Sequence, residues 1–341
     1  MNGLIPSSQP LLSFAEECNR GKVREDNQDT VLHARTALGE LSVVADGIGG
    51  LEGGGTASRI VVETIHGHLQ TLPGDYPADS AIREAAAIAN ANILAAAAAP
   101  DAPFKRMGST VVLALLQQNA AGTVAWIGHI GDSRAYRLRD GHIRRLTKDH
   151  SAVQELIDEN LLTPAEAGNH PDASVLTRSL GHYAEVEIDI EAVPLLPGDS
   201  LLLCSDGLWG FVPKQEIQTV MADAHLPIES TAKALLEMAL AAGGHDNIGI
   251  ELVRVGLPPA PAPEAVPQPV KEPQPVEEQD PIKVEAPIAP SPPLEVEETP
   301  KAQRPLKAEE PLKLGFVAIL SICLLGAAAL GAVLYFAFYK H

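Results

Sequence analysis

The stretch Leu41-Ser-Val-Val-Ala-Asp46-Gly47 is a short apolar run that ends at an aspartate. Two further runs repeat this form, Trp126-Ile-Gly-His-Ile-Gly-Asp132 and Leu201-Leu-Leu-Cys-Ser-Asp206, and a fourth aspartate, Asp246, precedes the apolar run 248–255. Short apolar runs of this kind are typical of buried strands. The sequence therefore predicts strands whose ends carry aspartates at the rim of a sheet.

Four aspartates at strand ends admit two interpretations. If they converge on one rim, their charges repel and raise each other's pKa, and divalent cations would remove that penalty. Carboxylate oxygens suit magnesium or manganese, so convergence predicts a metal-dependent hydrolase. Alternatively, each Asp-Gly pair is an ordinary turn, which is common after a strand. The spacing alone leaves both interpretations open.

The composition favours a mostly aliphatic globular protein that does not bind nucleic acid. Of the 341 residues, 45% are hydrophobic but only 4% are aromatic. The formal net charge of -19 would repel a phosphate backbone, which basic surfaces bind. The three cysteines, Cys18, Cys204 and Cys323, are far apart and have no metal or redox spacing, which is typical of a reducing compartment.

Three segments follow each other along the chain. Residues 1–256 have the composition of a globular domain, with 18 Lys+Arg and 33 Asp+Glu. Residues 257–313 hold 16 of the 28 prolines, which predicts a Pro/Glu-rich disordered linker. Residues 314–339 contain no charged side chain. A helix of this length would measure about 39 Å, enough to cross a bilayer core of about 30 Å.

The charges around residues 314–339 predict the orientation of this transmembrane helix. Lys301, Arg304, Lys307 and Lys313 precede it, whereas only Lys340 is charged after it. Basic residues favour the cytoplasmic side, and residues 1–12 have none of the features of a secretory signal. We therefore expect a single-pass protein of the inner (cytoplasmic) membrane with its globular domain in the cytoplasm.

Hydrophobic periodicity within residues 1–256 predicts a mixture of strands and helices. The expected helices are residues 56–72, 79–99, 151–160, 163–167, 214–222 and 228–241, with Thr163 as an N-cap before Pro164. The expected strands are residues 107–117, 123–130, 135–138, 143–146, 186–193, 201–204 and 248–255. Strands joined by short turns indicate antiparallel sheets with helices outside, an α+β arrangement without repeated βαβ units.

Several other hydrolase classes are excluded by missing motifs. The sequence has no Gly-x-Ser-x-Gly motif of the acyl hydrolases and no phosphate-binding Gly-x-x-x-x-Gly-Lys-Ser/Thr loop. The chain instead offers carboxylates and one well-placed arginine. This combination matches a metal-activated water better than a protein nucleophile.

Six short motifs occur in order along residues 12–255. They read Gly21-Lys-Val-Arg24-Glu-Asp-Asn27-Gln28-Asp29, Val44-Ala-Asp46-Gly47-Ile-Gly49-Gly50, Met107-Gly108-Ser109-Thr110, Gly131-Asp132-Ser133-Arg134, Leu203-Cys-Ser205-Asp206-Gly207 and Asp246-Asn247. This ordered set resembles the bacterial metal-dependent protein phosphatases (PPM, type 2C). The resemblance implies a PPM-type α-β-β-α sandwich of two antiparallel sheets flanked by helices. It also implies hydrolysis of phosphoserine and phosphothreonine with Mn2+ or Mg2+.

The same resemblance implies a set of metal ligands and catalytic residues. The implied metal ligands are Asp29, Asp46, Gly47, Asp132, Asp206 and Asp246. Asp46 would bridge two cations, the Gly47 carbonyl would bind one of them, and Asp206 and Asp246 would hold the other. Asp29 would support the first cation through water, and Asp132 would contribute with Asp206 to a third, weaker site. Arg24 would grip the substrate phosphate and, with Asp46, Asp206 and Asp246, form the catalytic set.

Simpler alternatives and departures from the family accompany these assignments. Arg24 could pair with Asp26 or Glu25, Asp132 could pair with Arg134, and Asp29 could be a turn residue. Ile48 stands where eukaryotic relatives have a histidine proposed as general acid, so the leaving group must take its proton from water or another residue. Gln28 replaces an acidic residue of some relatives, which weakens the first metal site.

Residues 150–180 correspond to the mobile flap over the active site of the family. The sequence of this segment resembles that of phosphatases that oppose kinases in bacterial type VI secretion. The similar stretches are Val153-Gln-Glu-Leu, Leu161-Leu, Glu166-Ala and His170-Pro. The flap contains two short helical pieces around Gly168-Asn-His-Pro171, consistent with a lid that influences substrate choice.

The sequence therefore predicts a membrane-anchored serine/threonine protein phosphatase that acts in bacterial signalling on the substrates of a Ser/Thr kinase. The predicted reaction is in-line attack of a metal-activated water on phosphorus. The alternative is a catalytically inactive pseudophosphatase that tethers phosphoproteins at the membrane. A purely structural role, in which the acidic domain is a docking face, would predict no metal affinity.

Overall fold

The computed structural model describes residues 10–49, 53–168 and 170–256. The predicted linker 257–313 and the predicted transmembrane helix 314–339 lie outside these residues. Among the helices that the structure describes, none is both long and apolar enough to cross a membrane.

The strands form two sheets, and every pairing between the described strands is antiparallel. The first sheet has the order β1-β11-β10-β7-β8, and the second has the order β2-β3-β5-β6-β9 with β4 paired to β3. The strands are β1 (Leu12–Asn19), β2 (Asp29–Arg35), β3 (Glu40–Ile48), β4 (Gly108–Ser109), β5 (Val111–Asn119), β6 (Gly122–Ile130), β7 (Arg134–Arg139), β8 (His142–Arg145), β9 (Asp189–Leu195), β10 (Ser200–Cys204) and β11 (Ile248–Val255).

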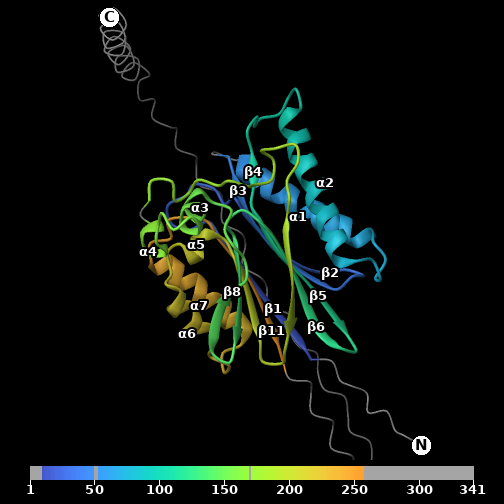
Figure 1. Cartoon of the computed structure of the whole chain (residues 1–341), viewed down its shortest axis with the longest axis vertical. Coiled ribbons are helices and arrows are strands. Elements are labelled where there is room, and N and C mark those ends of the chain that lie inside the picture. The colour runs from blue at the N-terminus through green and yellow to red at the C-terminus, as the bar shows by residue number, and fades with distance from the viewer. Residues whose placement is uncertain (1–9, 50–52, 169, 257–341) are drawn as a thin grey trace, which may run out of the picture. The chain divides into compact units, whose positions relative to one another are not determined.

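Helices cover the outer face of each sheet (Figure 1). Helices α1 (Gly53–Thr71) and α2 (Ala78–Ala98) pack on the second sheet, while α5 (Asp206–Trp209), α6 (Lys214–Met221) and α7 (Ile228–Ala241) pack on the first. Two short helices, α3 (Ala152–Asp158) and α4 (Pro164–Ala167), lie in the segment between β8 and β9. The order of layers is helix, sheet, sheet, helix.

Three apolar clusters hold these layers together. One joins α1 and α2 to the second sheet through side chains such as Ile65, Ile82 and Leu113. Another joins α7 to the first sheet through Leu235 and its neighbours. A third, which includes Val44 and other strand residues, fills the space between the two sheets. Side chains alternate between the two faces of a strand, so the central strands β5 and β10 are buried on both faces.

The helical layer follows from the spacing of apolar residues. In α7 the buried positions Ile228, Thr231, Ala232, Leu235, Leu236 and Ala239 recur every three or four residues, so they form one face of the helix. Pro227 precedes this helix, where a missing N–H costs nothing. In α4 the predicted cap is confirmed, because Thr163 and Glu166 form a reciprocal capping box.

Most predicted elements are present, and three differences matter for the site. Strands β1 and β2 were not predicted, because their sequences mix polar and apolar residues and contain no continuous apolar run. Strand β9 begins at Asp189, three residues after the predicted start at Val186. Asp46 was expected at the end of its strand, but β3 continues beyond it to Ile48 by pairing with β4.

The described domain begins and ends on neighbouring strands. Strands β1 and β11 pair over their full length, with Leu12 opposite Val255 at one end and Asn19 opposite Ile248 at the other. Asp246 lies just beyond the second of these ends. The chain therefore enters and leaves the domain at the strand ends that are remote from the aspartates.

Candidate active site

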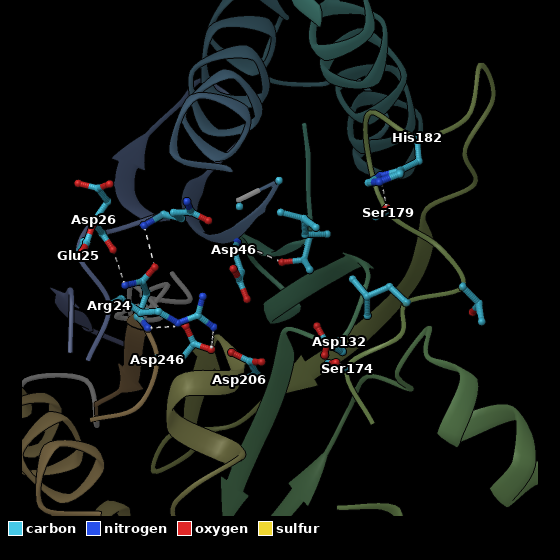
Figure 2. A pocket seen from close by; sticks show the side chains of 18 of the residues that line it. Arg24, Glu25, Asp26, Asp46, Asp132, Ser174, Ser179, His182, Asp206 and Asp246 are labelled. Atoms are coloured by element: carbon cyan, nitrogen blue, oxygen red, sulfur yellow. Dashed lines mark hydrogen bonds and ion pairs between the residues drawn. The ribbon is translucent and has the colours of Figure 1, made fainter. Parts of the chain in front are cut away.

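A cavity of about 540 Å³ opens at one end of the two sheets. Asp46, Asp132, Asp206 and Asp246 line it, although they come from four separate segments of the chain. Figure 2 shows their carboxylates around one shared space. We call these four aspartates the floor of the cavity. The interpretation as four unrelated turns is therefore wrong, because the side chains converge.

Backbone contacts position Asp46 and bring Asp206 close to Asp246. Asp46 exchanges hydrogen bonds with Thr110, whose N–H donates to the Asp46 carbonyl at 2.8 Å while its hydroxyl accepts from the Asp46 N–H at 3.1 Å. Asp206 is the first residue of α5, directly after β10. The next residue, Gly207, packs so closely on Asn247 that an added Cβ would overlap the Asn247 carbonyl. Glycine is therefore required for Asp206 and Asp246 to come together.

Burial and mutual repulsion raise the pKa values of the floor. The pKa of Asp46 lies well above its usual value, first because the carboxyl is buried and then because Asp29 and Asp206 are nearby. Burial also raises the pKa of Asp206, with further contributions from Asp132 and Asp246. The pKa of Asp132 rises to about 6, mainly through burial. Carboxylates held this way gain from a cation, and such perturbed groups cluster at functional sites.

Asp29 lies behind the floor and does not line the cavity. It pairs with Asp46 across β2 and β3, is only 6% exposed, and accepts a hydrogen bond of 2.6 Å from the Ser205 hydroxyl. Its Oδ1 is buried without a hydrogen-bond partner among the described residues. Burial, followed by the charge of Asp246, raises its pKa to about 7. This strand residue is not the ordinary turn residue of the simpler alternative.

The donor set fits divalent cations. Four convergent carboxylates and an orphaned buried carboxylate oxygen at Asp29 provide hard oxygen ligands with unmet charge. Magnesium and manganese prefer such ligands. Cys204, although close to Asp206 in the sequence, lies in the apolar core of the first sheet and does not line the cavity.

Arg24 lies at the side of the cavity and pairs with a floor residue. Its guanidinium donates to Asp246 at 2.6 Å, and its side chain is 53% exposed. The alternative of a local pair with Asp26 or Glu25 is not the contact observed. Figure 2 shows Arg24 beside Asp246, with Glu25 and Asp26 directed away from the floor. A half-exposed guanidinium beside the carboxylates is available to an incoming phosphate.

Asn247 holds the loop that carries Arg24. Its side-chain NH2 donates to the carbonyls of Arg20 and Asp26, both at 2.9 Å, and its carbonyl oxygen accepts from the Gln28 N–H at 2.8 Å. One side chain thereby orders the loop over residues 20–28 against the segment that bears Asp246. The amide uses three hydrogen bonds at once, which neither aspartate nor leucine could provide.

The predicted alternative pairing of Asp132 with Arg134 is also not the contact observed. Arg134 forms a bidentate ion pair with Asp149, with its Nη2 at 2.6 Å, and its guanidinium stacks 3.3 Å above the ring of Trp209. Trp209 is the last residue of α5, so Arg134 links that helix to the segment that precedes the flap. Asp132 is left facing the cavity.

One side of the cavity is formed by the flap and the residues just after it. We call this the flap wall, and its residues are Ser174, Leu176, Thr177, Ser179, His182 and Tyr183. Ser179 and His182 share a hydrogen bond of 2.8 Å between Oγ and Nδ1. Figure 2 places this pair on the opposite side of the cavity from Arg24.

Three residues that support the site received no role in the sequence analysis. They are Ser205, which binds Asp29, Asn247, which orders the Arg24 loop, and His182, which lines the flap wall. The first two lay inside quoted motifs, directly beside a predicted ligand, and that adjacency was the available signal. His182 had no such signal, because only folding brings it to the cavity.

Comparison with known proteins decides the family. The family described as Protein phosphatase 2C matches residues 20–241. This chain belongs to the protein phosphatase 2C family. Its fold is accordingly that of the PPM phosphatases, with two antiparallel sheets and flanking helices.

Individual members of the family are similar over the same region. The serine/threonine protein phosphatase PstP of Mycobacterium tuberculosis is 36% identical over 249 residues, which are 72% of this chain and 45% of PstP. The chain thus spans about half the length of that curated relative. A crystal structure of the PstP catalytic domain with two manganese ions has a TM-score of 0.63 at 33% identity, and covers 72% of this chain and 99% of that one.

A third similar protein is PppA of Pseudomonas aeruginosa, described as a key regulatory component of the type VI secretion system. Its structure is 34% identical with a TM-score of 0.60, and covers 71% of this chain and 97% of that one. The residues matched to the family, 20–241, contain Arg24, the flap and three of the floor aspartates, Asp46, Asp132 and Asp206.

Proposed function

We propose that this protein is a metal-dependent phosphatase that hydrolyses phosphoserine and phosphothreonine in proteins. The observation that carries the proposal is the convergence of Asp46, Asp132, Asp206 and Asp246 in one cavity, with Arg24 at its side. Membership in the protein phosphatase 2C family supports the same reaction.

The floor and two neighbouring residues would hold two cations. Asp46 and the Gly47 carbonyl would bind one cation, Asp206 and Asp246 would hold the second, and Asp46 would bridge them. Asp29 would support the first cation, and Asp132 would contribute to a weaker third site. When bound, the cations supply an activated water and offset charge on the phosphoryl oxygens.

The remaining tasks fall to side chains around the floor. Arg24 would exchange its contact with Asp246 for the substrate phosphate and fix the phosphorus in line for attack. Because the Ile48 side chain has no acidic proton to donate, the leaving serine or threonine oxygen must be protonated by water or by another group in the cavity.

Phosphopeptide turnover tests this proposal. The purified full chain with Mn2+ should release phosphate from a phosphothreonine peptide, and chelation with EDTA should stop the release. Asp46→Asn and Asp206→Asn should lower turnover by about 10²–10³-fold or more, because each removes charge that stabilises the transition state. Asp75→Asn is the matched control, because it makes the same change at an exposed position that does not line the cavity, and its turnover should equal that of the wild type.

Two results would reject the proposed reaction. Equal turnover in Asp46→Asn and the wild type would remove the floor from the mechanism. Tight manganese binding, measured by calorimetry, without turnover of any phosphopeptide would favour a pseudophosphatase that only binds phosphoproteins.

We further propose that residues 314–339 anchor the protein in the inner membrane with the phosphatase domain in the cytoplasm. The support comes from the sequence, in which 26 uncharged residues follow a cluster of basic ones. The full chain should sediment with membranes and resist extraction by carbonate, whereas a chain ending at residue 313 should be released. Release of both forms would contradict the anchor.

The substrates are proposed to be proteins phosphorylated by a bacterial Ser/Thr kinase, and a link to type VI secretion is proposed within that class. Two similarities support this link: the flap sequence resembles that of phosphatases of type VI secretion, and the chain is 34% identical to PppA. Deletion of the gene should raise phosphothreonine on secretion components in a phosphoproteome. If phosphothreonine rises only on proteins outside the secretion system, the link to secretion is contradicted, whereas the proposed phosphatase reaction is not.

A further inference from the structure

The flap leaves the sandwich after His150 and returns at Arg178, and both of these residues contact one carboxylate. Asp189, the first residue of β9, lies 3.2 Å from His150 Nε2 through its Oδ2. Its Oδ1 accepts a hydrogen bond of 2.6 Å from Arg178 Nη1. Each oxygen of Asp189 thus holds one end of the flap.

The proton on His150 is fixed by its surroundings. The Gly131 N–H donates to His150 Nδ1 at 3.1 Å, so this nitrogen is an acceptor and the other nitrogen carries the proton. His150 is therefore a neutral donor to Asp189. Burial and the neighbouring His129 ring lower the pKa of His150 to about 4, in agreement with a neutral ring.

The same residues could be read as a metal site by proximity alone. One ligand atom from each of His129, His150 and Asp189 lies within 4.8 Å of the others. However, both ring nitrogens of His150 already have protein partners, and Asp189 is already paired with the Arg178 cation. His129 likewise pairs its Nε2 with the Lys148 carbonyl at 2.8 Å. The contacts favour a hydrogen-bonded bridge.

The base of the flap is closed by backbone contacts beside this bridge. The Thr177 N–H donates to the His150 carbonyl at 2.9 Å, and the Ala152 N–H donates to the Val175 carbonyl at 2.8 Å. Arg178 lies between Thr177 and Ser179, two residues of the flap wall. A displacement of Arg178 would therefore move the flap wall directly, although Asp189 itself does not line the cavity.

We propose that Asp189 is a positioning residue that holds the flap wall in place for binding of the peptide part of the substrate. This inference rests on the proposed phosphatase function. It separates two parts of substrate recognition: the floor and Arg24 bind the phosphate, whereas the Asp189 bridge matters only for substrates that reach the flap wall. A small phosphate ester occupies the floor and does not need the bridge.

The test compares two substrates in the purified full chain with Mn2+. Asp189→Ala should raise KM for a phosphothreonine peptide by about 5–50-fold, because two hydrogen bonds to a charged group are lost. Its kcat on the peptide, and both constants on p-nitrophenyl phosphate, should stay at the wild-type values. Glu191→Ala is the matched control, since it removes an exposed carboxylate from the same face of β9.

A second variant tests whether the effect passes through Arg178. Arg178→Ala should raise KM for the peptide, and the double variant should be no worse than Asp189→Ala alone, because the two side chains share one contact. Additive losses would overturn the bridge. Thermal melting of each variant identifies any that fail to fold, and Arg178→Ala then carries the test.

Further outcomes separate this inference from the proposed function. If the wild type turns over neither substrate, the proposed function fails. If the wild type is active and Asp189→Ala loses activity equally on both substrates, the positioning role is wrong. The same holds if Asp189→Ala retains full activity on both. A transition metal bound one to one in the purified chain, and lost in both His129→Ala and Asp189→Ala, would also overturn the bridge.

Discussion

The floor and the flap wall face each other across one cavity but are built differently. The floor aspartates lie in or beside strands β3, β6, β10 and β11, which are paired with neighbours in the two sheets. The flap wall belongs to a single excursion of the chain whose helices, α3 and α4, have seven and four residues. Its base is held by the Asp189 bridge and a few backbone contacts.

This difference separates the chemistry from the choice of substrate. A paired sheet keeps carboxylates at constant separations, which cation binding requires. An excursion with few contacts tolerates changes in sequence and conformation, so it can adapt to different peptides without disturbing the carboxylates. Variants of the floor should therefore affect every substrate, and variants of the flap wall should affect peptides alone.

Among variants that keep every floor carboxylate, Gly207→Ala should have the largest effect. The added Cβ overlaps the Asn247 carbonyl, so Asp206 and Asp246 must move apart. A displacement of this kind can cost about 10²-fold in rate, and we expect at least this loss on both a phosphopeptide and p-nitrophenyl phosphate. Gly168→Ala in the flap is the control, because its Cβ meets nothing within 4 Å. Equal activity of both variants would show that the spacing of the floor is not critical.

Arg24→Ala should have the next largest effect. The loss of a hydrogen bond to a charged phosphate costs about 1.5–3 kcal/mol, so kcat/KM should fall by about 10–100-fold on both substrates. Arg24→Lys keeps the charge without the planar fork and should recover only part of the activity. Lys22→Ala, which removes another exposed cation of the same loop, should be neutral. A loss limited to peptides would place Arg24 functionally with the flap wall.

His182→Ala should have a smaller effect that is limited to peptides. It removes the hydrogen bond with Ser179 and leaves the floor intact. One neutral hydrogen bond is worth about 0.5–1.5 kcal/mol, so kcat/KM for a phosphopeptide should fall by about 2–10-fold. Steady-state kinetics on p-nitrophenyl phosphate should be unchanged, as should both activities of the exposed His225→Ala control. A larger loss on the small ester would instead give His182 a part in the chemistry.

Glu251→Gln should change no activity and serves as the comparison for burial without function. Glu251 is fully buried in β11 opposite Glu16, and neither of its carboxylate oxygens has a hydrogen-bond partner among the described residues. Burial, reinforced by Glu16, raises its pKa from 4.5 to about 9. The folded protein therefore retains a proton that the unfolded chain releases.

The sign of the resulting pH dependence follows from this shift. The contribution of Glu251 to stability is complete below pH 4.5 and is lost as the pH rises toward 9. Glutamine does not titrate, so the variant should lose less stability over this range in urea unfolding followed by circular dichroism. Identical pH dependence of the two proteins would mean that Glu251 is already ionised in the fold.

The sequence predicted the parts of the molecule whose signals are local. Apolar periodicity located α7 and β11 at their observed bounds, and the capping residues located α4. The floor was predicted because each aspartate adjoins an apolar run, although the evidence for convergence came from the resemblance of the ordered motifs. The residue spacing alone could not distinguish convergence from separate turns.

The parts that sequence analysis missed depend on contacts made only after folding. Strands β1 and β2 mix polar and apolar residues, and their regular structure depends on pairing with β11 and β3. Asp189 is the first residue of β9, a strand predicted to start three residues earlier, and its partners His150 and Arg178 lie 39 and 11 residues away in the sequence. No local sequence pattern identifies a carboxylate that contacts both ends of the flap.

The pairing of β1 with β11 has a consequence for how the domain can be attached to other bodies. Because Leu12 and Val255 are neighbours at the end of the strand pair away from Asp246, both termini of the domain lie about 25 Å from the catalytic mouth, at about 3.3 Å per strand residue. Fusion partners, surface tethers or fluorescent labels attached at either terminus should leave access for bulky phosphoproteins unobstructed. The same proximity makes the domain suitable for circular permutation, with the original ends joined by a short peptide.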